Sequence, residues 1–594
     1  MKCSKIVFCI LVVFLPVNLC LIGCAAEEED NSPPLSAQPA PGDVADLFDP
    51  DKGFPAKLSN SFKVYGFANP VATQAFGADP TALVYKDRVY LYMSNDTFLY
   101  DPNGVPWYQN QVEGEFSYGK GIQGVRMLSS ADMVNWTCHG AFNITGPENT
   151  NPLIDNDEWE AQRSIDISGI SRSWAPTAAF KRIDGKDKFF IYWGNGGNGI
   201  GVVMSDSPTG PFRSPWNRML IDRDTPNCRN VDYLFDPGVL VDDDGQGYLF
   251  FGGGTSYALA DPPGNANDTG MARRVMLGDD MLSLKGDPER WHVPYLFEAS
   301  EIAKIFGNYF LMWSTHGSTG GNEWGLKNTQ MACMRSYGFV GIWDKDQWSE
   351  PFGVLDHPAT QLGTSDSNNH GVMFEFKGKA YIAYHSQMLA MAMGVSRYRA
   401  TSIDEMQIDS DGNIDPVKMT RKGVSPVAKL NPYVKNEAET IGVQGGIYTR
   451  PLSGADNGQV VTSIDTGDWL AVYNVDFGSG AKKFSARVQT PSTEGYKGAI
   501  ELRVNPTAAG HTNDTQNLNE TRTTAIEGGT VIGRAYFDGK SGYQQITVAL
   551  SGAVTGVQDL VFVFYSSSTN SPLTIKPDNR HKDGFEFDSW QFYK

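Results

Sequence analysis

The pattern of apolar and polar residues repeats five times between residues 78 and 387. Each repeat has a small or polar opening, an apolar stretch, a turn containing Gly or Asp, and an aromatic stretch, which is typical of a β-hairpin. The repeats are ADPTALVYKDRVYLYMSND from residue 78, WAPTAAFKRIDGKDKFFIYWGN from 174, FDPGVLVDDDGQGYLFFGGG from 235, FEASEIAKIFGNYFLMWSTHG from 297 and NHGVMFEFKGKAYIAYHSQ from 369. Their openings are 96, 61, 62 and 72 residues apart. Such spacing leaves room for about four strands per unit, so we predict an all-β domain over residues 61–424, folded as a five-bladed β-propeller.

The openings of these repeats are the candidate functional positions. The innermost strand of a propeller blade begins near the central channel, so the openings should face one shared cavity. We interpret Asp79, Asp236 and Glu298 as equivalent positions in the first, third and fourth repeats. A buried carboxylate is costly unless it is paired or its raised pKa is useful, so three converging acids indicate catalysis. Glu301 is interpreted as a partner behind the site.

A different pattern follows residues 425–433, SPVAKLNPY, which we interpret as a linker. Short alternating strands with glycine-containing turns, such as DWLAVYNVDFGSGAKKFSARV and DLVFVFYS, fill the rest of the chain. This pattern is typical of a β-sandwich, so a second all-β domain is expected over residues 434–594.

The first 23 residues, which precede Cys24, predict a secretory leader with two lysines and an apolar stretch too short for a transmembrane helix. The sequence LIGC ends at Cys24 and resembles a bacterial lipobox, which implies that Cys24 carries lipid; plain secretion is the alternative. The next residues, AAEEED, resemble an acidic signal that directs lipoproteins to the outer cell surface. Residues 24–60, including NSPPLSAQPAPGD, predict a flexible tether. We therefore expect an outer-membrane lipoprotein of a Gram-negative bacterium, facing the cell surface or the periplasm.

Composition and charge limit the classes of molecule that the protein can bind. The chain has 594 residues, of which 41% are hydrophobic and 12% aromatic, and its net charge of −19 argues against nucleic acid or an anionic membrane surface as a partner. Beyond Cys24 only Cys138, Cys228 and Cys333 remain, which allow at most one disulfide and show no metal-ligand spacing. No motif for a nucleotide, flavin or haem is present, so no organic cofactor is expected.

The ordered motifs GADPTALVY, SWAPTAAF, LFDPGVLVDDDG, LFEASEIAK and NNHGVMFEF…YIAYHSQ together resemble glycoside hydrolase family 43, whose members are five-bladed β-propellers. The resemblance runs from about Asn69 to Ile414 and is closest to the arabinoxylan-acting members. It implies that Asp79 is the general base that activates water and Glu298 the general acid that protonates the leaving oxygen. Asp236 would raise the pKa of the acid and orient it. Hydrolysis of a glycoside at neutral pH needs one ionised and one neutral carboxyl, which fits this division.

The same resemblance implies further site residues. Trp174 would form a wall against the sugar; the alternative is an aromatic residue of the blade core. Arg399 would approach the acids and hold Asp236 ionised, although Arg397 is close enough in sequence to take that place. His370 would bind a central calcium that is otherwise coordinated by water; the alternative is a buried, hydrogen-bonded histidine.

The C-terminal domain resembles a family 6 carbohydrate-binding module, a jelly roll, through NEAETIG, SIDTGDWLAVYNVDFGSGAKKFSARV and FEFDSWQF. The resemblance implies a structural calcium held by Glu437, Glu439 and Asp588. It also implies a sugar cleft, in which Tyr543 replaces the usual Trp, Ser463 the second aromatic residue and Glu586 the usual Asn. These replacements remove one stacking face and an amide, so binding at this cleft is open. Trp469 and Trp590 are expected in the core.

The predicted function is that of an inverting, exo-acting glycoside hydrolase that removes α-L-arabinofuranosyl side chains from arabinoxylan-type plant hemicellulose. A β-D-xylosidase acting on xylo-oligosaccharides is the alternative within the same class, and the loops at 101–120 and 145–173 would decide between them. The alternative from another class is a non-catalytic, glycan-binding surface lipoprotein.

Overall fold

The computed structural model describes residues 32–39, 58–59, 61–96, 122–144, 172–216, 218–260, 262–265, 267–336, 347–393, 397–492, 494–508, 526–567 and 584–594. Its helices are the short α2 (Pro358–Leu362) and α3 (Met388–Met393) and the 3-10 turn η4 (Tyr257–Leu259); the other elements are strands. The predicted leader, Cys24, and the loop at 101–120 lie outside the described residues, as does the loop at 145–173 except for its last two positions. Within the described ranges, no helix is long and apolar enough to cross a membrane.

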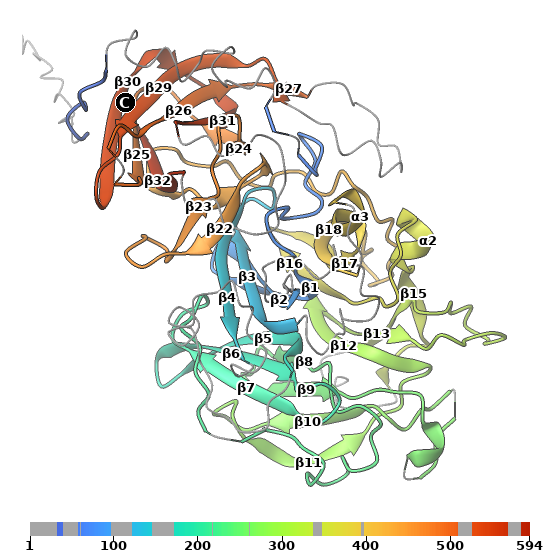
Figure 1. Ribbon diagram of the computed structural model, residues 1–594. Helices are drawn as coiled ribbons and strands as arrows, with labels where there is room; N and C mark the ends of the chain where they lie inside the picture. The colour runs from blue at the N-terminus through green and yellow to red at the C-terminus, as the bar shows by residue number, and fades with distance from the viewer. Residues whose placement is uncertain are drawn as a thin grey trace, which may run out of the picture.

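The described residues of the first unit form five antiparallel sheets, in chain order from blue to yellow in Figure 1. Their strands are β1 (Ala78–Tyr85), β2 (Arg88–Asp96), β3 (Ile122–Ser130) and β4 (Trp136–Asn143); β5 (Trp174–Ile183), β6 (Lys186–Gly194) and β7 (Ile200–Ser205); β8 (Gly238–Val241), β9 (Gly247–Phe251), β10 (Arg273–Leu277) and β11 (Leu284–Arg290); β12 (Leu296–Ile305), β13 (Asn308–Thr315), β14 (Met331–Ser336) and β15 (Phe352–Leu355); β16 (Gly371–Phe376), β17 (Lys379–Ser386) and β18 (Ala400–Met406). The first two strands of every sheet pair with each other, so all five predicted hairpins are confirmed.

The first strands of the five sheets pack against one another. β1 contacts β5 and β16, β8 contacts β5 and β12, and β12 contacts β16. The approach of β8 to β12 requires a glycine, because a Cβ on Gly238 would lie 2.4 Å from the carbonyl oxygen of Ser300. The openings of the five hairpins are therefore gathered in one region of the first unit.

The second unit is a sandwich of two antiparallel sheets. One sheet contains β22 (Tyr448–Pro451), β23 (Gln459–Thr462), β32 (Glu586–Tyr593), β25 (Ala481–Gln489) and β30 (Tyr543–Val554), with β19 (Asn436–Glu437) beside β32. The other contains β21 (Val443–Gly445), β24 (Trp469–Asp476), β31 (Val557–Ser566), β26 (Lys497–Val504) and β29 (Thr530–Asp538); the small pair β27 (Thr507–Ala508) and β28 (Ile526–Glu527) is separate. Trp590 is buried with Phe484 and Phe562 between the sheets, so its predicted core position is confirmed.

The two units share a buried interface. Trp469 and Tyr473, on the outer face of β24, pack in one cluster with Trp136 of β4. The strand β20 (Thr440–Ile441) pairs with β4 and adds a fifth strand to the first sheet. Trp469 is therefore buried, as expected, but between the units rather than inside the sandwich.

The predicted linker is fixed to both units. The N–H of Val427 donates to the carbonyl of Asp132 in the first unit, and the N–H of Leu430 donates to the carbonyl of Asn474 in the second. The hydrophobic cluster at the interface and these bonds hold the sandwich against the first sheet. In Figure 1 the sandwich, orange to red, lies above β3 and β4.

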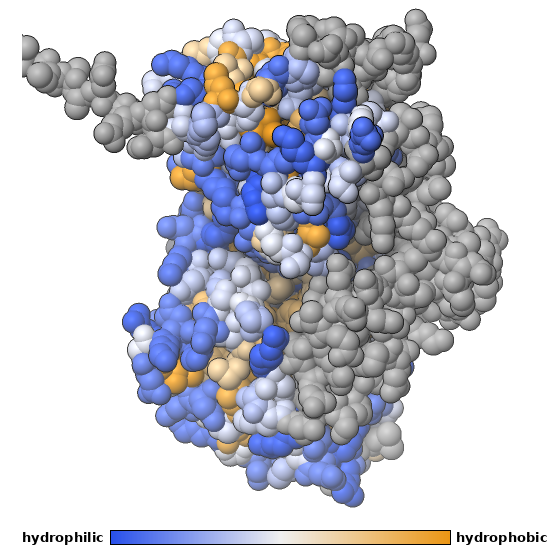
Figure 2. Space-filling model, turned by 60° about the vertical axis from the view of Figure 1, so that its left-hand side comes forward, coloured by the Kyte–Doolittle hydropathy of each residue, from blue (hydrophilic) through white to orange (hydrophobic). Residues whose placement is uncertain are grey.

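The surface of the described residues carries few large apolar side chains. On the face shown in Figure 2, hydrophobic residues lie in small separate groups among hydrophilic ones. Among the described residues, the most exposed large hydrophobic side chain is that of Leu35, with 54% of its surface accessible. Leu35 belongs to the segment that the sequence predicted as part of the tether.

Candidate active site

The strand register places the acids at two successive positions of the repeat. Ala78 of β1, Trp174 of β5 and Glu298 of β12 pair with Ser94, Gly194 and Ser314 respectively. The residue after each of these three has a positive φ: 48° at Asp79, 40° at Ala175 and 62° at Ala299. Asp236, with φ of 46°, holds this same second position. Glu298 is therefore equivalent to Trp174, one residue before the position of Asp79 and Asp236, and our interpretation of three equivalent acids was wrong by one residue.

The backbone has the same irregularity at these positions in β1 and β12. A bulge follows each opening, between Ala78 and Thr81 in β1 and between Glu298 and Glu301 in β12, so one extra residue is accommodated before regular pairing resumes. A non-Gly residue with positive φ is strained and is retained where it aims a side chain. The acids therefore come from two neighbouring positions: Asp79 and Asp236 from the residue with positive φ, and Glu298 from the residue before it.

Asp79 is buried and held by several donors. Its Oδ1 accepts from Nη1 of Arg399 at 2.7 Å, and its Oδ2 accepts from the hydroxyl of Ser94 at 2.7 Å. Nδ1 of His385 lies 3.1 Å from Oδ1 and accepts the backbone N–H of Asp79 at 3.0 Å. Burial alone would raise the pKa of Asp79, but the charge of Arg399 outweighs it and holds that pKa well below its usual range. Asp79 is thus ionised at neutral pH.

Arg399 is the arginine of the site. It is buried, and it donates from Nε and Nη2 to the two carboxylate oxygens of Asp96, each at 3.0 Å, in addition to its bond to Asp79. Arg397 is exposed. Arg399 therefore lies where the resemblance implied, but the carboxylates it contacts are Asp79 and Asp96, whereas we expected it to hold Asp236 ionised.

Asp236 and Glu298 have the opposite ionisation tendency from Asp79. Burial and the negative charge of Asp79 raise the pKa of Asp236 to about 7. Burial, together with the charges of Asp236 and Asp79, raises the pKa of Glu298 well above its usual value. Oδ2 of Asp236 accepts the N–H of Ala299 at 2.9 Å, next to Glu298, while Oε1 of Glu298 is buried without a hydrogen-bond partner among the described residues. The cluster thus holds one ionised acid beside one protonated acid.

His370 lies between two of the acids. Its Nδ1 is 3.8 Å from Oδ1 of Asp79 and 4.0 Å from Oδ2 of Asp236. Burial lowers its pKa to about 4, so the imidazole is neutral at neutral pH. Both readings of this residue, a buried polar histidine and a metal ligand, require the neutral form.

Trp174 begins β5 and is partly exposed. It holds the position in β5 that Glu298 holds in β12. The guanidinium of Arg172 lies 5.4 Å from the centre of its ring. A partly exposed ring at an opening is less consistent with a blade-core residue than with one that lines the site.

Glu301 is behind the site, as expected. It is buried, pairs with Met312 of β13, and forms a hydrogen bond with Thr177 of β5. Burial, with the charge of Asp236, raises its pKa well above the usual value. Glu301 is therefore a neutral acid that joins β12 to β5.

Sequence reasoning missed Ser94, Asp96 and His385. All three lie at or near the end of the second strand of a hairpin, in YMSND and AYHSQ. In an antiparallel hairpin the end of the second strand lies opposite the start of the first. This rule, applied to the openings already identified, would have found them.

The module residues that were expected to bind calcium are partly free and partly paired. Oε2 of Glu437 and Oε2 of Glu439 are buried without a hydrogen-bond partner among the described residues. Asp588 instead forms an ion pair with Arg487 and accepts the N–H of Asp456 at 3.1 Å. In the described part of the chain, no three His, Cys, Asp or Glu side chains are grouped closely enough to hold a metal ion by themselves.

The expected sugar cleft of the module is occupied by charged side chains. The guanidinium of Arg487 lies 3.7 Å from the centre of the Tyr543 ring, and Arg450 forms an ion pair with Glu586. Ser463 is buried. One face of the only aromatic ring of this cleft is therefore covered.

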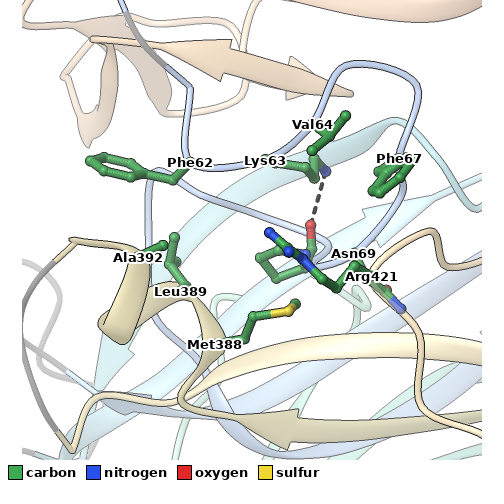
Figure 3. Close-up of a pocket in the computed structure, with 10 residues that line it drawn as sticks. Phe62, Lys63, Val64, Phe67, Asn69, Met388, Leu389, Ala392 and Arg421 are labelled. Atoms are coloured by element: carbon green, nitrogen blue, oxygen red, sulfur yellow. Dashed lines mark hydrogen bonds between the residues drawn. The ribbon is translucent and has the colours of Figure 1, made fainter. Parts of the chain in front are cut away.

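A separate cavity lies between the segment that precedes β1 and helix α3 (Figure 3). The buried ammonium of Lys63 donates to the carbonyl of Pro70 at 2.9 Å and to that of Ala68 at 3.3 Å. Burial lowers the pKa of Lys63 to about 7. The lining contains none of the acids described above, so this cavity is not the active site.

Fold and site together define a class: an all-β protein in which an ionised carboxylate faces a protonated one has the arrangement that glycoside hydrolysis requires. Residues 67–414 match the family model described as glycosyl hydrolases family 43, and residues 437–576 match carbohydrate binding module family 6. The chain belongs to glycosyl hydrolase family 43 and is a glycoside hydrolase that carries a family 6 carbohydrate-binding module.

Similar proteins match over most of the chain. It is 36% identical over 540 residues to an arabinoxylan arabinofuranohydrolase of Bacillus subtilis, which covers 89% of this chain and 93% of that protein. It is 35% identical over 544 residues to an arabinoxylan arabinofuranohydrolase of Paenibacillus polymyxa, covering 89% of this chain and 75% of the relative. A crystal structure of a family 43 arabinoxylan arabinofuranohydrolase from Bacillus subtilis, in complex with cellotetraose, superposes with a TM-score of 0.73 at 33% identity, over 90% of this chain and 99% of the other.

Proposed function

We propose that this glycoside hydrolase is an inverting, exo-acting enzyme that removes α-L-arabinofuranosyl side chains from arabinoxylan-type hemicellulose. The observation that carries hydrolysis of a glycoside is the opposed ionisation of Asp79 and Glu298 in one cluster; inversion of the anomeric centre is proposed from the resemblance to family 43. The substrate class is supported by two relatives named as arabinoxylan arabinofuranohydrolases, each at least 35% identical over most of this chain.

In the proposed mechanism Asp79 takes a proton from the attacking water. Its two oxygens are oriented by Arg399 and Ser94, so the carboxylate is fixed before substrate arrives. Glu298 gives its proton to the glycosidic oxygen as the bond to the sugar breaks. Asp236 accepts the N–H of Ala299, the residue next to Glu298. Its negative charge raises the pKa of Glu298 and keeps that acid protonated. Trp174 would contact the apolar face of the sugar.

Product analysis on arabinoxylan tests this function. We expect release of arabinose with no shortening of the xylan chain. Release of xylose from xylo-oligosaccharides instead would assign the protein as a β-D-xylosidase. Binding of the polysaccharide without any released sugar would identify a non-catalytic glycan-binding protein.

Asp236→Asn should move the alkaline limb of the pH profile of kcat/KM. The charge of Asp236 raises the pKa of Glu298, so its removal lowers that pKa and the acid loses its proton at lower pH. We expect the limb to shift toward acid by about one pH unit, in addition to a lower maximum. The acidic limb, set by the ionisation of Asp79, is expected to stay below about pH 4 in both proteins. An unchanged alkaline limb would contradict the role given to Asp236.

We also propose that the five sheets of residues 61–424 are the blades of a closed five-bladed propeller. The support is the order in which the first strands touch, from β1 through β5, β8, β12 and β16 and back to β1. Backbone bonds from the segment before β1 to β18, such as Val71 N–H to the carbonyl of Thr401, would close the ring. In this arrangement Asp79 and Glu298 lie on different, non-adjacent blades, the first and the fourth, and Asp236 lies on the third, beside Glu298.

Calcium is proposed at two places. In the module the unpaired oxygens of Glu437 and Glu439 would ligate it, and Asp588 would add negative charge from its pair with Arg487; burial and repulsion among these carboxylates raise the pKa of both glutamates. In the channel, His370 is the one side chain proposed as a ligand, and water would supply the oxygen atoms that calcium prefers. Calcium bound to the module would neutralise the carboxylates of Glu437 and Glu439.

The calcium proposal for the module is tested by thermal unfolding. We expect EDTA to lower Tm by several degrees, calcium to restore it, and Glu439→Gln to reduce this response, leaving only the part due to the channel site. An identical Tm with and without calcium would contradict the site.

Because Arg487 covers one face of Tyr543, any sugar binding by the module is expected to be weak and to be unchanged in Tyr543→Ala.

We propose that Cys24 carries a lipid that anchors the chain in the outer membrane of a Gram-negative bacterium. The support is the sequence LIGC after an apolar stretch. Cys24→Ala should release the protein into the soluble fraction with its hydrolytic activity intact, because Cys24 precedes in sequence the residues predicted for both domains, 61–424 and 434–594. Unchanged membrane fractionation of the variant would reject this anchor.

A further inference from the structure

Residues Ser32–Pro39, which the sequence predicted as flexible tether, lie against the carbohydrate-binding module. The N–H of Ser36 donates to the carbonyl of Thr547 at 2.8 Å, and the N–H of Thr547 donates back to Oγ of Ser36 at 3.0 Å. The N–H of Tyr536 donates to Oε1 of Gln38 at 3.0 Å, and Nζ of Lys483 donates to Oγ of Ser32 at 2.6 Å. Every one of these partners belongs to the sandwich.

Three of these four bonds fall on two strand edges, and the fourth comes from Lys483 of β25, the strand next to β30. Thr547 is in β30, the terminal strand of one sheet, and Tyr536 is in β29, the terminal strand of the other. β29 and β30 contact each other, so the two edges form one open side of the sandwich. Terminal strands present unpaired backbone groups that invite association with other chains. The segment supplies acceptors to N–H groups on both edges.

The composition of the segment suits a cap on an edge. Pro33, Pro34 and Pro39 have no backbone N–H, so the segment offers few donors to a further strand on its outer side. Leu35 is 54% exposed, and attachment therefore depends on hydrogen bonds rather than on burial of this side chain. A short polar segment rich in proline can close an edge without creating a new one.

We propose that Ser32–Pro39 is an intramolecular strap, which closes the open side of the sandwich and ties the N-terminal part of the chain to the module rather than to the catalytic unit. If the lipid anchor proposed for Cys24 holds, eight residue steps separate it from Ser32, which span at most about 28 Å. The module would then lie next to the membrane. β11, at the opposite end of the molecule in Figure 1, would be held away from it.

Hydrogen exchange on the full-length Cys24→Ala chain tests the strap without relying on lipidation. The double variant Ser36→Pro/Gln38→Ala removes the N–H and Oγ of residue 36 and the side-chain amide of residue 38. In this variant we expect peptides covering Tyr536 and Thr547 to exchange at least about tenfold faster. The matched control Leu35→Ala alters an exposed side chain and should exchange like the parent. Unchanged exchange in the double variant would overturn the strap.

Energy transfer to an acceptor lipid in vesicles tests the orientation. A fluorophore at Lys540→Cys on the module should transfer more efficiently than one at Asp287→Cys on β11, and Ser36→Pro/Gln38→Ala should reduce this difference. Equal transfer from both labels on a membrane-bound protein would contradict the orientation. A chain that does not bind vesicles would refute the anchor alone, because the exchange experiment still decides the strap.

Discussion

Glu298→Gln is expected to lower kcat/KM on arabinoxylan by about 10³-fold while leaving a substrate with a good leaving group, such as a nitrophenyl arabinofuranoside, within about tenfold of the parent. The natural leaving oxygen is basic and needs the proton of Glu298, whereas a nitrophenolate departs without it. Glutamine keeps the size of the side chain and has no acidic proton to give. Steady-state kinetics on both substrates measure this contrast, and equal losses on the two would contradict the role of general acid.

Glu301→Gln is the matched control for that variant. Glu301 lies three residues along the same strand and is buried, and its raised pKa keeps it neutral, so an amide replaces it with little change in charge. We expect activity within about tenfold of the parent on both substrates. A loss in Glu301→Gln as large as that in Glu298→Gln would mean that disruption of β12, rather than proton donation, explains both.

Asp79→Asn should lower kcat by about 10⁴-fold on both substrates, because activation of water is needed whatever the leaving group. The loss should appear in kcat more than in KM, since the carboxylate acts on the attacking water. Arg399 keeps its two bonds to Asp96, so the variant should remain folded, and its Tm checks this. Activity on the activated substrate that is close to that of the parent would show that Asp79 is not the base.

The hairpins and the acids could be predicted because local pattern determines them. Apolar stretches around a Gly or Asp turn specify β1–β2 and its four counterparts directly, and the residues at their openings follow. Asp79, Asp236 and Glu298 were found this way, and their mutual effect on pKa agrees with a single cluster. The exact position of Glu298 was missed, because LFEASEIAK aligns by its letters with LFDPGVLV, whereas the strand pairing makes Glu298 equivalent to Trp174.

The groups that tune the acids were harder to predict. Asp96 is about 300 residues from Arg399 in sequence, and only the folded chain, which brings the end of β2 to the residue before β18, shows that they form a pair. The surroundings of Trp469 were equally hard to predict. An apolar residue in a strand is expected to be buried, but the sequence does not show which unit it packs against. The segment Ser32–Pro39 has the composition of a tether, and its attachment depends on open strand edges formed some 500 residues later.

The stereochemistry of the first product tests the central claim most directly. In the proposed inverting mechanism the ionised Asp79 activates water while the protonated Glu298 gives its proton to the leaving oxygen, whereas in a retaining enzyme the ionised carboxylate attacks the sugar itself. Proton NMR of the reaction on an α-L-arabinofuranoside, recorded before mutarotation, should show β-L-arabinofuranose as the first sugar released. The α-anomer as the first product, or a glycosyl ester trapped on Asp79, would show that Asp79 is a nucleophile and would contradict this mechanism.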